Sequence, residues 1–175
     1  VKVGFQTVTQ LVDTLGGITV NNPQDFSTGE YTFKQGNIEL NGSQALAFAR
    51  ERYSFASGDR ERGKNQMRVL TGILNKLMSP SILTNYASIM QSLASTFHTN
   101  MGMDDISALV KSQLNNGGSW KIYSNSLDGN GGTDYCYELG DNASVVYPDE
   151  NSISEAKTDI EAVTMGEEPP YVISQ

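Results

Sequence analysis

The sequence predicts an α/β domain, in which helices and short strands follow one another along the chain. Apolar residues recur at helical spacing over residues 5–15, and Gly16 and Gly17 directly after them are typical of a helix end. The next segment, residues 18–21, has the apolar and polar alternation of a short strand. A helix that leads at once into a strand is a common step of an α/β domain. Four further helical patterns follow before a last region with strand-like residues.

Capping and breaking residues divide the rest of the chain into elements. Ser43 is a suitable N-cap for a helix, and Pro80 ends the long helix that begins near Asp59 because the residue before a proline avoids helical dihedral angles. The predicted strands cover residues 1–4, 31–33, 38–40, 120–123 and 145–147, of which 31–33 and 38–40 form a hairpin. The predicted helices cover residues 44–50, 59–78, 81–97, 104–115 and 151–164.

Length and charge limit the classes of function open to the chain. Its 175 residues are enough to bury the core of one domain. Its 20 Asp and Glu residues outnumber its 12 Lys and Arg residues, for a net charge of −8. Nucleic acid is therefore not expected as the main partner, because phosphate neutralisation needs a broad basic surface. The one cysteine, Cys136, forms no disulfide framework, and the one histidine, His98, fits no catalytic triad or zinc motif.

A cationic segment interrupts this acidic composition. Residues 41–68 hold six of the twelve Lys and Arg residues, namely Arg50, Arg52, Arg60, Arg62, Lys64 and Arg68. In a helix that begins near Asp59, this residue shares one face with Arg62 and Gln66, since they follow at i+3 and i+7. Guanidinium groups match phosphate oxygens as a fork, and a helix N-terminus adds N–H groups and a positive dipole end. The segment therefore predicts a site for phosphate or pyrophosphate.

The residues leave a second interpretation open. The same cations are compatible with a solvated helical face that is paired with Glu51, Asp59 and Glu61. The apolar helical faces are typical of a packed core, although a groove for a lipid chain needs the same residue types. Because no nucleophile–base pair or nucleotide-binding glycine motif is recognisable, the chemistry left to the arginines is electrostatic. They would hold phosphate oxygens as charge moves to a leaving phosphate, and a divalent ion would share that work.

Two blocks of the sequence resemble a known family. The segments similar to the second half of the LytR-CpsA-Psr family domain are residues 40–42, 44–52 and 58–66, which include Arg50-Glu51-Arg52 and Gly58-Asp59-Arg60-Glu61-Arg62. The segments similar to the preceding block of that domain, in the same order and spacing, are residues 3–5 and 11–20. The resemblance implies a three-layer α/β/α fold, with a mixed central sheet flanked by helices, whose N-terminal part lies upstream of Val1.

The resemblance also implies a function. Members of the family are regarded as transferring glycopolymers, such as capsule or teichoic acid, from a polyprenyl-pyrophosphate carrier to peptidoglycan with the help of Mg²⁺. We therefore expect an extracytoplasmic phosphotransferase whose partners are the polyprenyl-pyrophosphate-linked glycopolymer and peptidoglycan, with no nucleic acid. We also expect a location on the extracellular side of the cell membrane, with a single membrane anchor upstream of Val1. Residues 1–175 by themselves are expected to lack full activity.

The same resemblance assigns roles to residues of the cationic segment. The residues that it predicts to bind the pyrophosphate are Arg50, Arg52, Arg62 and Gln66. Asp59 is predicted to orient Arg62 or to act as a base, so Asp59 and Arg62 are the predicted catalytic residues. The other cations of the segment lie off that helical face and are weaker candidates. The aspartates that bind the metal are expected upstream of Val1, and none is expected in this chain.

Other functions and the domain limits complete the predictions. A non-catalytic module that holds polyprenyl phosphate or a glycan remains an alternative, as does transcriptional attenuation, which the family name suggests. Residues 1–128 are predicted to be the C-terminal portion of the catalytic domain, 129–165 its continuation with the last strand and helix, and 166–175 a flexible tail. The Asp and Asn residues of 128–134 weakly resemble a calcium-binding loop, but no Glu occupies its twelfth position.

Overall fold

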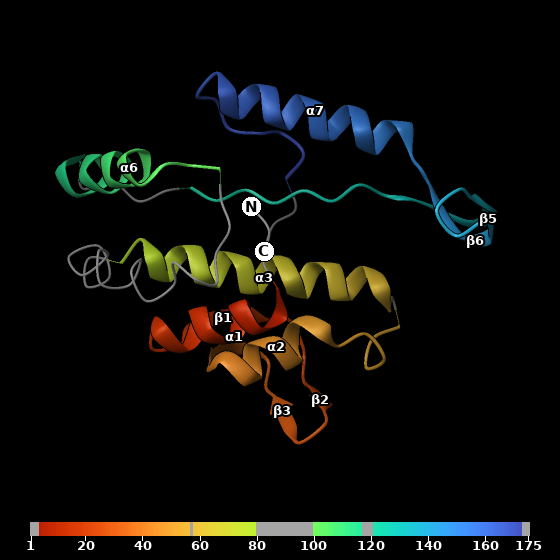
Figure 1. Ribbon diagram of the computed structural model, residues 1–175, viewed down its shortest axis with the longest axis horizontal. Helices are drawn as coiled ribbons and strands as arrows, with labels where there is room; N and C mark the ends of the chain where they lie inside the picture. The colour runs from red at the N-terminus through yellow and green to blue at the C-terminus, as the bar shows by residue number, and fades with distance from the viewer. Residues whose placement is uncertain (1–3, 57, 80–99, 117–120, 173–175) are drawn as a thin grey trace. The chain divides into compact units, whose positions relative to one another are not determined.

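The structure of the protein is a computed structural model that describes residues 4–56, 58–79, 100–116 and 121–172 (Figure 1). The chain divides into two compact units, residues 1–120 and residues 121–175. The predicted features that lie outside the described residues are the helix over 81–97, His98 and most of the strand over 1–4. Within the described part of the chain, no helix is long and apolar enough to cross a membrane.

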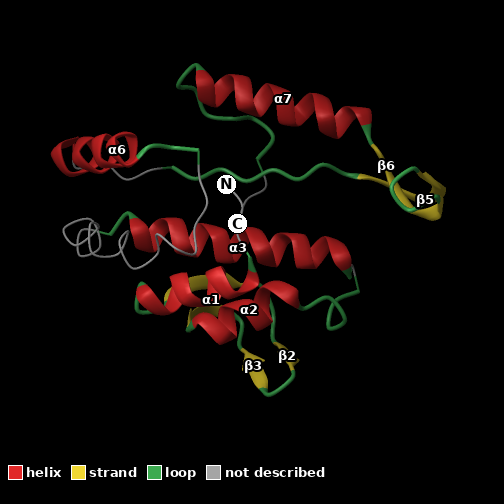
Figure 2. Ribbon diagram, viewed as in Figure 1, coloured by secondary structure: helices red, strands yellow, loops and turns green. Residues whose placement is uncertain are grey.

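The first unit begins with helix α1 (Phe5–Thr14), close to its predicted limits. Gly16 and Gly17 follow with φ of 73° and 90°, in the left-handed region that glycine favours. The N–H of Gly17 donates to the carbonyl oxygen of Val12 at 2.9 Å, which closes the end of the helix. Strand β1 (Ile18–Asn22) starts directly afterwards, so the predicted step from helix to strand is confirmed (Figure 2).

The strands of this unit pair differently from the prediction. Strand β1 is antiparallel to β4 (Gly36–Leu40), and β2 (Phe26–Thr28) is antiparallel to β3 (Tyr31–Phe33). The predicted hairpin of residues 31–33 with residues 38–40 is therefore wrong. Each of these segments is a strand, but each has a different partner from the one expected.

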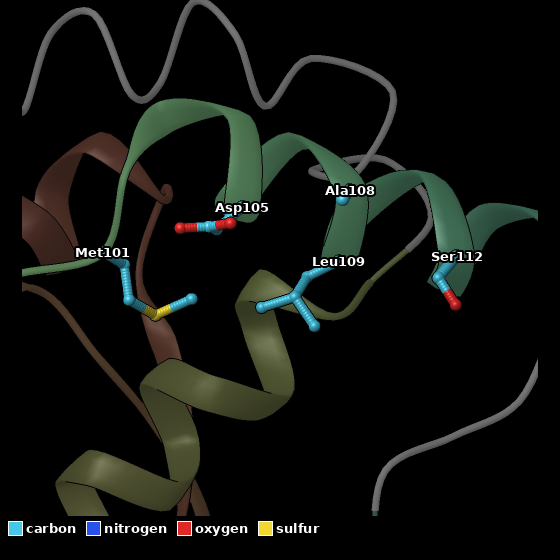
Figure 3. Close-up of a pocket in the computed structure, with 5 residues that line it drawn as sticks. All are labelled: Met101, Asp105, Ala108, Leu109 and Ser112. Atoms are coloured by element: carbon cyan, nitrogen blue, oxygen red, sulfur yellow. The ribbon is translucent and has the colours of Figure 1, made fainter.

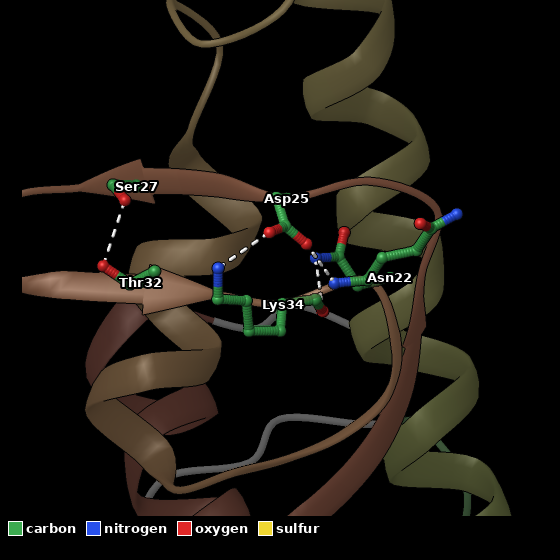
Figure 4. Close-up of polar contacts among 6 residues, drawn as sticks. Asn22, Asp25, Ser27, Thr32 and Lys34 are labelled. Carbon is green, nitrogen blue, oxygen red and sulfur yellow. Dashed lines mark hydrogen bonds and ion pairs between the residues drawn. The ribbon is translucent and has the colours of Figure 1, made fainter.

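Polar contacts at the base of the β2–β3 hairpin explain this pairing (Figure 4). Asp25 accepts a hydrogen bond from the N–H of Gln35 at 2.7 Å, and its other carboxylate oxygen lies 2.8 Å from Lys34 Nζ. The side-chain amide of Asn22 donates to the carbonyl oxygen of Lys34 at 2.9 Å. These contacts close the hairpin before the chain enters β4, which is then placed beside β1.

Helix α2 (Gly42–Arg50) begins two residues before its predicted start. The N-cap is Asn41 rather than Ser43. The side chain of Asn41 accepts from the N–H of Gln44 at 2.9 Å, and the side chain of Gln44 accepts from the N–H of Asn41 at 2.9 Å. This reciprocal capping box satisfies two backbone donors and fixes the start of the helix.

Two glycines allow the helices of the first unit to pack closely. A Cβ atom on Gly42 would lie 2.2 Å from the carbonyl oxygen of Thr9, so α2 rests directly on α1. A Cβ atom on Gly72 of helix α3 (Asp59–Leu77) would lie 2.8 Å from the carbonyl oxygen of Thr19 in β1. Both distances are too short for any larger residue without backbone movement.

The buried face of α3 agrees only in part with its apolar pattern, which places Leu70 and Ile73 on the inner side. Ile73 is buried, but 45% of the surface of Leu70 is exposed. Val69 is buried as well, and Asn65 is fully buried. The helix therefore presents a mixed face to β1, in which a polar amide lies among apolar residues.

An aromatic cluster forms one side of the core in the first unit. Its members are Phe26, Phe33, Phe48 and Phe55, whose rings contact one another at centroid distances between 4.9 and 5.3 Å. All four are buried, and Phe48 is fully so. Because Phe48 belongs to α2 and Phe26 and Phe33 belong to the β2–β3 hairpin, the cluster attaches the hairpin to the helix.

Helix α6 (Met103–Asn116) occurs where a helix over residues 104–115 was predicted. Asp105 in its first turn accepts from the N–H of Gly102 at 3.3 Å. The residues that line a pocket along α6 are Met101, Asp105, Ala108, Leu109 and Ser112 (Figure 3). None of them belongs to the predicted pyrophosphate site.

The second unit consists of a hairpin and a helix. Strand β5 (Gly129–Cys136) pairs along its whole length with the antiparallel strand β6 (Asp141–Pro148). The segment that weakly resembled a calcium loop is therefore mostly strand. The predicted strand over 120–123 is not formed over residues 121–123, whereas the predicted last strand is present and longer than expected.

Helix α7 (Glu150–Thr164) confirms the predicted last helix. Its N-cap is Asp149, whose carboxylate accepts from the N–H of Ser152 at 3.1 Å. Asp159 on this helix is buried, and its carboxylate accepts from the side-chain amide of Asn125 at 2.5 Å and from the N–H of Tyr171 at 2.9 Å. This carboxylate joins three segments of the second unit.

Candidate functional site

The predicted site begins at the C-terminal end of α2 with Arg50 and Arg52, here called the arginine pair. Both side chains are exposed. The guanidinium carbon of Arg50 lies 5.1 Å from the ring centroid of Phe5, and that of Arg52 lies 4.7 Å from the ring centroid of Tyr53. Arg52 also donates to the hydroxyl of Tyr53 at 3.0 Å. Stacking on an aromatic face restrains a guanidinium group and leaves its N–H donors available.

Glu51, between the two arginines, faces the opposite way. Its carboxylate accepts from the backbone N–H groups of Tyr53 at 2.6 Å and Ser54 at 2.8 Å, and only 7% of the residue is exposed. Burial acts to raise the pKa of Glu51, but hydrogen bonds from Thr28, Ser54 and Tyr53 outweigh it and hold the pKa below its ordinary value. Glu51 had been considered as an ion-pair partner for the cations, but its carboxylate instead holds backbone groups.

The segment after the arginine pair rests on the β2–β3 hairpin. The ring of Phe55 is buried and lies 4.9 Å from that of Phe26. The hydroxyl of Ser54 donates to the carbonyl oxygen of Ser27 at 3.0 Å. The hairpin therefore supports the turn that carries Arg52, a role that its sequence did not predict.

The first turn of α3 contributes the second part of the predicted site. Asp59 Oδ1 lies 2.6 Å from Arg62 Nη2, so the structure brings these two predicted residues together. Both are partly exposed, with 69% of the Asp59 side chain and 37% of the Arg62 side chain accessible. Gln66, one helical turn beyond Arg62, is exposed. The N-cap residue Gly58 provides no side-chain hydrogen bond to the start of the helix.

Two other cations of the segment, Lys64 and Arg68, have partners on α3 itself. Arg68 donates to Glu61 Oε1 at 2.6 Å and to Asn65 Oδ1 at 2.7 Å, and Lys64 Nζ lies 3.7 Å from Glu61 Oε2. Their lower rank as pyrophosphate ligands agrees with these contacts. The side-chain nitrogen of Asn65 is buried without a hydrogen-bond partner among the described residues. No feature of the sequence indicated that Asn65 would be buried.

Comparison with known proteins identifies the family. The model of the LytR_cpsA_psr family matches residues 1–162. The chain belongs to this family. The resemblance that was inferred from the arginine segment is thereby confirmed.

The relatives of this LytR_cpsA_psr protein include proteins named as transferases. The chain is 35% identical over 133 residues to the polyisoprenyl-teichoic acid–peptidoglycan teichoic acid transferase TagU of Oceanobacillus iheyensis, a match that covers 76% of this chain and 41% of the relative. The chain therefore spans about two fifths of the length of that protein.

Solved structures of the family share the fold. The Lin1025 protein of Listeria innocua is 34% identical, with a TM-score of 0.70, over 88% of this chain and 64% of that protein. TagU of B. subtilis is 30% identical, with a TM-score of 0.65, over 91% of this chain and 62% of that protein. With its mixture of helices and strands, the chain has the predicted α/β fold class.

The Mg²⁺ ion that the resemblance implies would need ligands among the side chains of the protein. Magnesium prefers several oxygen ligands, including one or two carboxylates. The described ranges of the chain contain no group of three or more His, Cys, Asp or Glu residues that could hold a metal ion. Asp59, the carboxylate of the predicted site, is paired with Arg62. The described residues alone therefore do not fit the ion.

Proposed function

We propose that this LytR_cpsA_psr chain is part of a glycopolymer–peptidoglycan phosphotransferase. In this proposal Arg50, Arg52 and Arg62, here called the arginine cluster, hold the pyrophosphate of a polyprenyl carrier. The observation that carries the proposal is the exposed arginine pair at the end of α2 in a chain of this family. Teichoic acid is the proposed glycopolymer class, because a relative that is 35% identical to this chain is named as a teichoic acid transferase.

The physical properties of the arginine cluster suit a pyrophosphate. Each guanidinium group remains charged at any physiological pH and offers a planar fork of donors. Phe5 and Tyr53 restrain the arginine pair from one side, so their donors are presented with less loss of conformational entropy. Arg62 is held by Asp59 in the first turn of α3, where the helix dipole also favours an anion.

The proposed reaction is a phosphoryl transfer. An oxygen of an acceptor hydroxyl on peptidoglycan forms a bond to the phosphorus that bears the glycopolymer. The bond from this phosphorus to the bridging oxygen breaks, and polyprenyl phosphate leaves with the bonding electrons. The hydroxyl proton passes to a base, for which Asp59 is the proposed group in this chain. Arg62 stabilises the negative charge that develops on the leaving phosphate.

The location and partners are part of the same proposal. A polyprenyl carrier and peptidoglycan meet at the extracellular side of the cell membrane, where the proposed enzyme would be held by an N-terminal anchor. The proposal assigns Gln66 to a neutral hydrogen bond with a phosphate oxygen, because it is exposed one turn beyond Arg62. The proposal includes no nucleic acid among the partners, in keeping with the net charge of −8.

Binding of farnesyl pyrophosphate, a short polyprenyl pyrophosphate, tests the site in this chain. We expect Arg50→Ala and Arg62→Ala each to weaken binding by roughly tenfold or more, because each removes a charge-assisted contact. Isothermal titration calorimetry with and without Mg²⁺ gives the dissociation constants. Lys111→Ala is the matched control, since it removes an exposed positive charge from α6.

The pattern across the variants decides the result. The proposal requires that farnesyl monophosphate binds less tightly than the pyrophosphate and that Lys111→Ala binds as the unmodified chain does. If both arginine variants retain the affinity of the unmodified chain, the arginine cluster is a solvated face and the site assignment is wrong. If the arginine variants are weakened but a chain of full family length shows no transfer of glycopolymer, the function is that of a binding module.

A further inference from the structure

Glu51 has surroundings that are unusual for a residue between two arginines. A carboxylate in this position would be expected to pair with its neighbours or to extend into solvent. Instead it is buried, and it accepts hydrogen bonds from two backbone N–H groups and from the side chain of Thr28. All of these donors belong to the turn that follows α2 or to the β2–β3 hairpin.

The backbone at Glu51 connects this burial to the exposure of its neighbours. Glu51 is the C-cap of α2 and has extended dihedral angles, with φ of −67° and ψ of 133°. In an extended chain, successive side chains point to opposite sides. The Glu51 carboxylate is anchored inside, whereas Arg50, the last residue of α2, and Arg52, directly after Glu51, are both exposed.

We propose that Glu51 is a positioning residue, whose buried carboxylate fixes the turn after α2 so that both members of the arginine pair face the pyrophosphate. The inference rests on the proposed function of the arginine cluster. Glu51 does not touch the ligand in this proposal. It acts through Arg50 and Arg52, and the β2–β3 hairpin acts with it because Thr28 and Ser27 hold the same turn.

The direction in which pyrophosphate affinity changes when Glu51 is replaced separates a positioning role from a simple charge effect. A carboxylate beside two arginines repels an anionic ligand, so its removal alone would tighten pyrophosphate binding. A residue that only stabilises the fold would leave the affinity of the folded protein unchanged. Loss of a positioning residue should instead weaken pyrophosphate binding, because without the Glu51 carboxylate the arginine pair can move away from its arrangement.

The test measures farnesyl pyrophosphate binding by Glu51→Ala and Glu51→Gln, below the melting temperature of each variant. We expect Glu51→Ala to weaken binding by roughly tenfold, about the value of one charge-assisted contact. Glu51→Gln keeps the shape of the side chain and one carbonyl acceptor for the two N–H groups, so it should restore most of the affinity. Glu30→Ala, which removes an exposed carboxylate from the β2–β3 turn, is the matched control and should not weaken binding.

A double-mutant cycle identifies the residues through which Glu51 acts. In the Arg50→Ala, Arg52→Ala background, the tenfold effect of Glu51→Ala should largely disappear, because the groups that it positions are gone. In the Arg62→Ala background it should persist, since Arg62 has its own partner, Asp59. Equal effects in both backgrounds would overturn the proposal.

The other possible outcomes distinguish failure of the positioning role of Glu51 from failure of the proposed function. Tighter or unchanged binding by Glu51→Ala overturns the inference, provided that the Arg50→Ala, Arg52→Ala protein binds more weakly than the unmodified chain. If that double variant binds normally, or the unmodified chain binds no probe, the proposed function fails and the inference fails with it. If Glu51→Ala does not fold, Thr28→Val takes its place, with an expected weakening of roughly threefold. Unchanged binding by a folded Thr28→Val protein overturns the inference.

Discussion

The two units of the molecule differ in charge and in what holds them together. Residues 1–120 carry ten Lys and Arg against nine Asp and Glu, whereas residues 121–175 carry two against eleven. The first unit therefore has nearly balanced charge, and the acidic character of the chain comes from the second. The buried hydrophobic residues among those described all lie between Leu11 and Ile73, inside the first unit.

The second unit is held mainly by hydrogen bonds. Its β5–β6 ladder is continuous, and the buried Asp159 ties α7 to segments on either side of it. Large apolar residues of this unit are exposed, among them Leu127, Tyr135, Tyr137, Leu139, Val146 and Met165. The comparison shows that the arginine cluster belongs to the unit that holds the buried apolar residues, which would give the proposed anion site a rigid support.

The largest expected loss of stability comes from a substitution in the core of the first unit. Phe48 is fully buried against Phe26 and Phe33, so Phe48→Ala should lower the free energy of unfolding by about 3–5 kcal/mol. Urea unfolding followed by circular dichroism measures this. Tyr137→Ala in the second unit removes an aromatic ring that is 92% exposed and should change stability by less than about 0.5 kcal/mol. Similar losses from the two variants would contradict the contrast between the units.

An intermediate effect is expected in the second unit at Asp159. Replacement by Ala removes the acceptor for Asn125 and for the N–H of Tyr171, which should cost about 1–3 kcal/mol. Hydrogen exchange of the Tyr171 amide reports the loss directly, because protection of that amide depends on the carboxylate. Glu155→Ala, on an exposed position of the same helix, is the control and should leave the exchange rate unchanged. Unaltered protection in Asp159→Ala would show that the segment is held by other contacts.

The smallest effects concern two carboxylates whose pKa is lowered by hydrogen bonds, the buried Glu51 and the exposed Glu168. Burial acts to raise the pKa of Glu51, but hydrogen bonds outweigh it; at Glu168 the side-chain hydrogen bond from Lys121 lowers the pKa. A folded-state pKa below the unfolded value gives stability that is present above the unfolded pKa, near 4.5, and is lost as pH falls through the folded pKa.

Unfolding measured from pH 7 downward in 0.15 M salt separates the two cases. The stability difference between the unmodified chain and Glu51→Gln should shrink below about pH 4.5, because protonation removes the advantage of the carboxylate. Glu168→Gln should match the unmodified chain over the whole range, since the Lys121–Glu168 pair is exposed and screened by salt. A pH-independent difference for Glu51→Gln would mean that its charge contributes nothing to the fold.

Much of the local structure was predictable from nearby residues. The limits of α1, α6 and α7 follow from apolar spacing and from capping residues within the same few positions. The family was predictable too, because the motif Arg50-Glu51-Arg52 and the segment from Gly58 to Gln66 are contiguous in the sequence. Asp59 and Arg62 are three residues apart on one helix, so their ion pair follows from helical geometry.

The charge, the family and the helices were thus determined by the order of the residues alone, because each depends on composition or on neighbours along the chain. Strand partners, the buried face of α3 and the inward direction of Glu51 were decided by the tertiary structure. Each of these depends on contacts between distant segments, as when Asp25 closes the β2–β3 hairpin or Thr28 reaches Glu51. A side chain between two arginines faces solvent or protein according to which donors the fold brings to it.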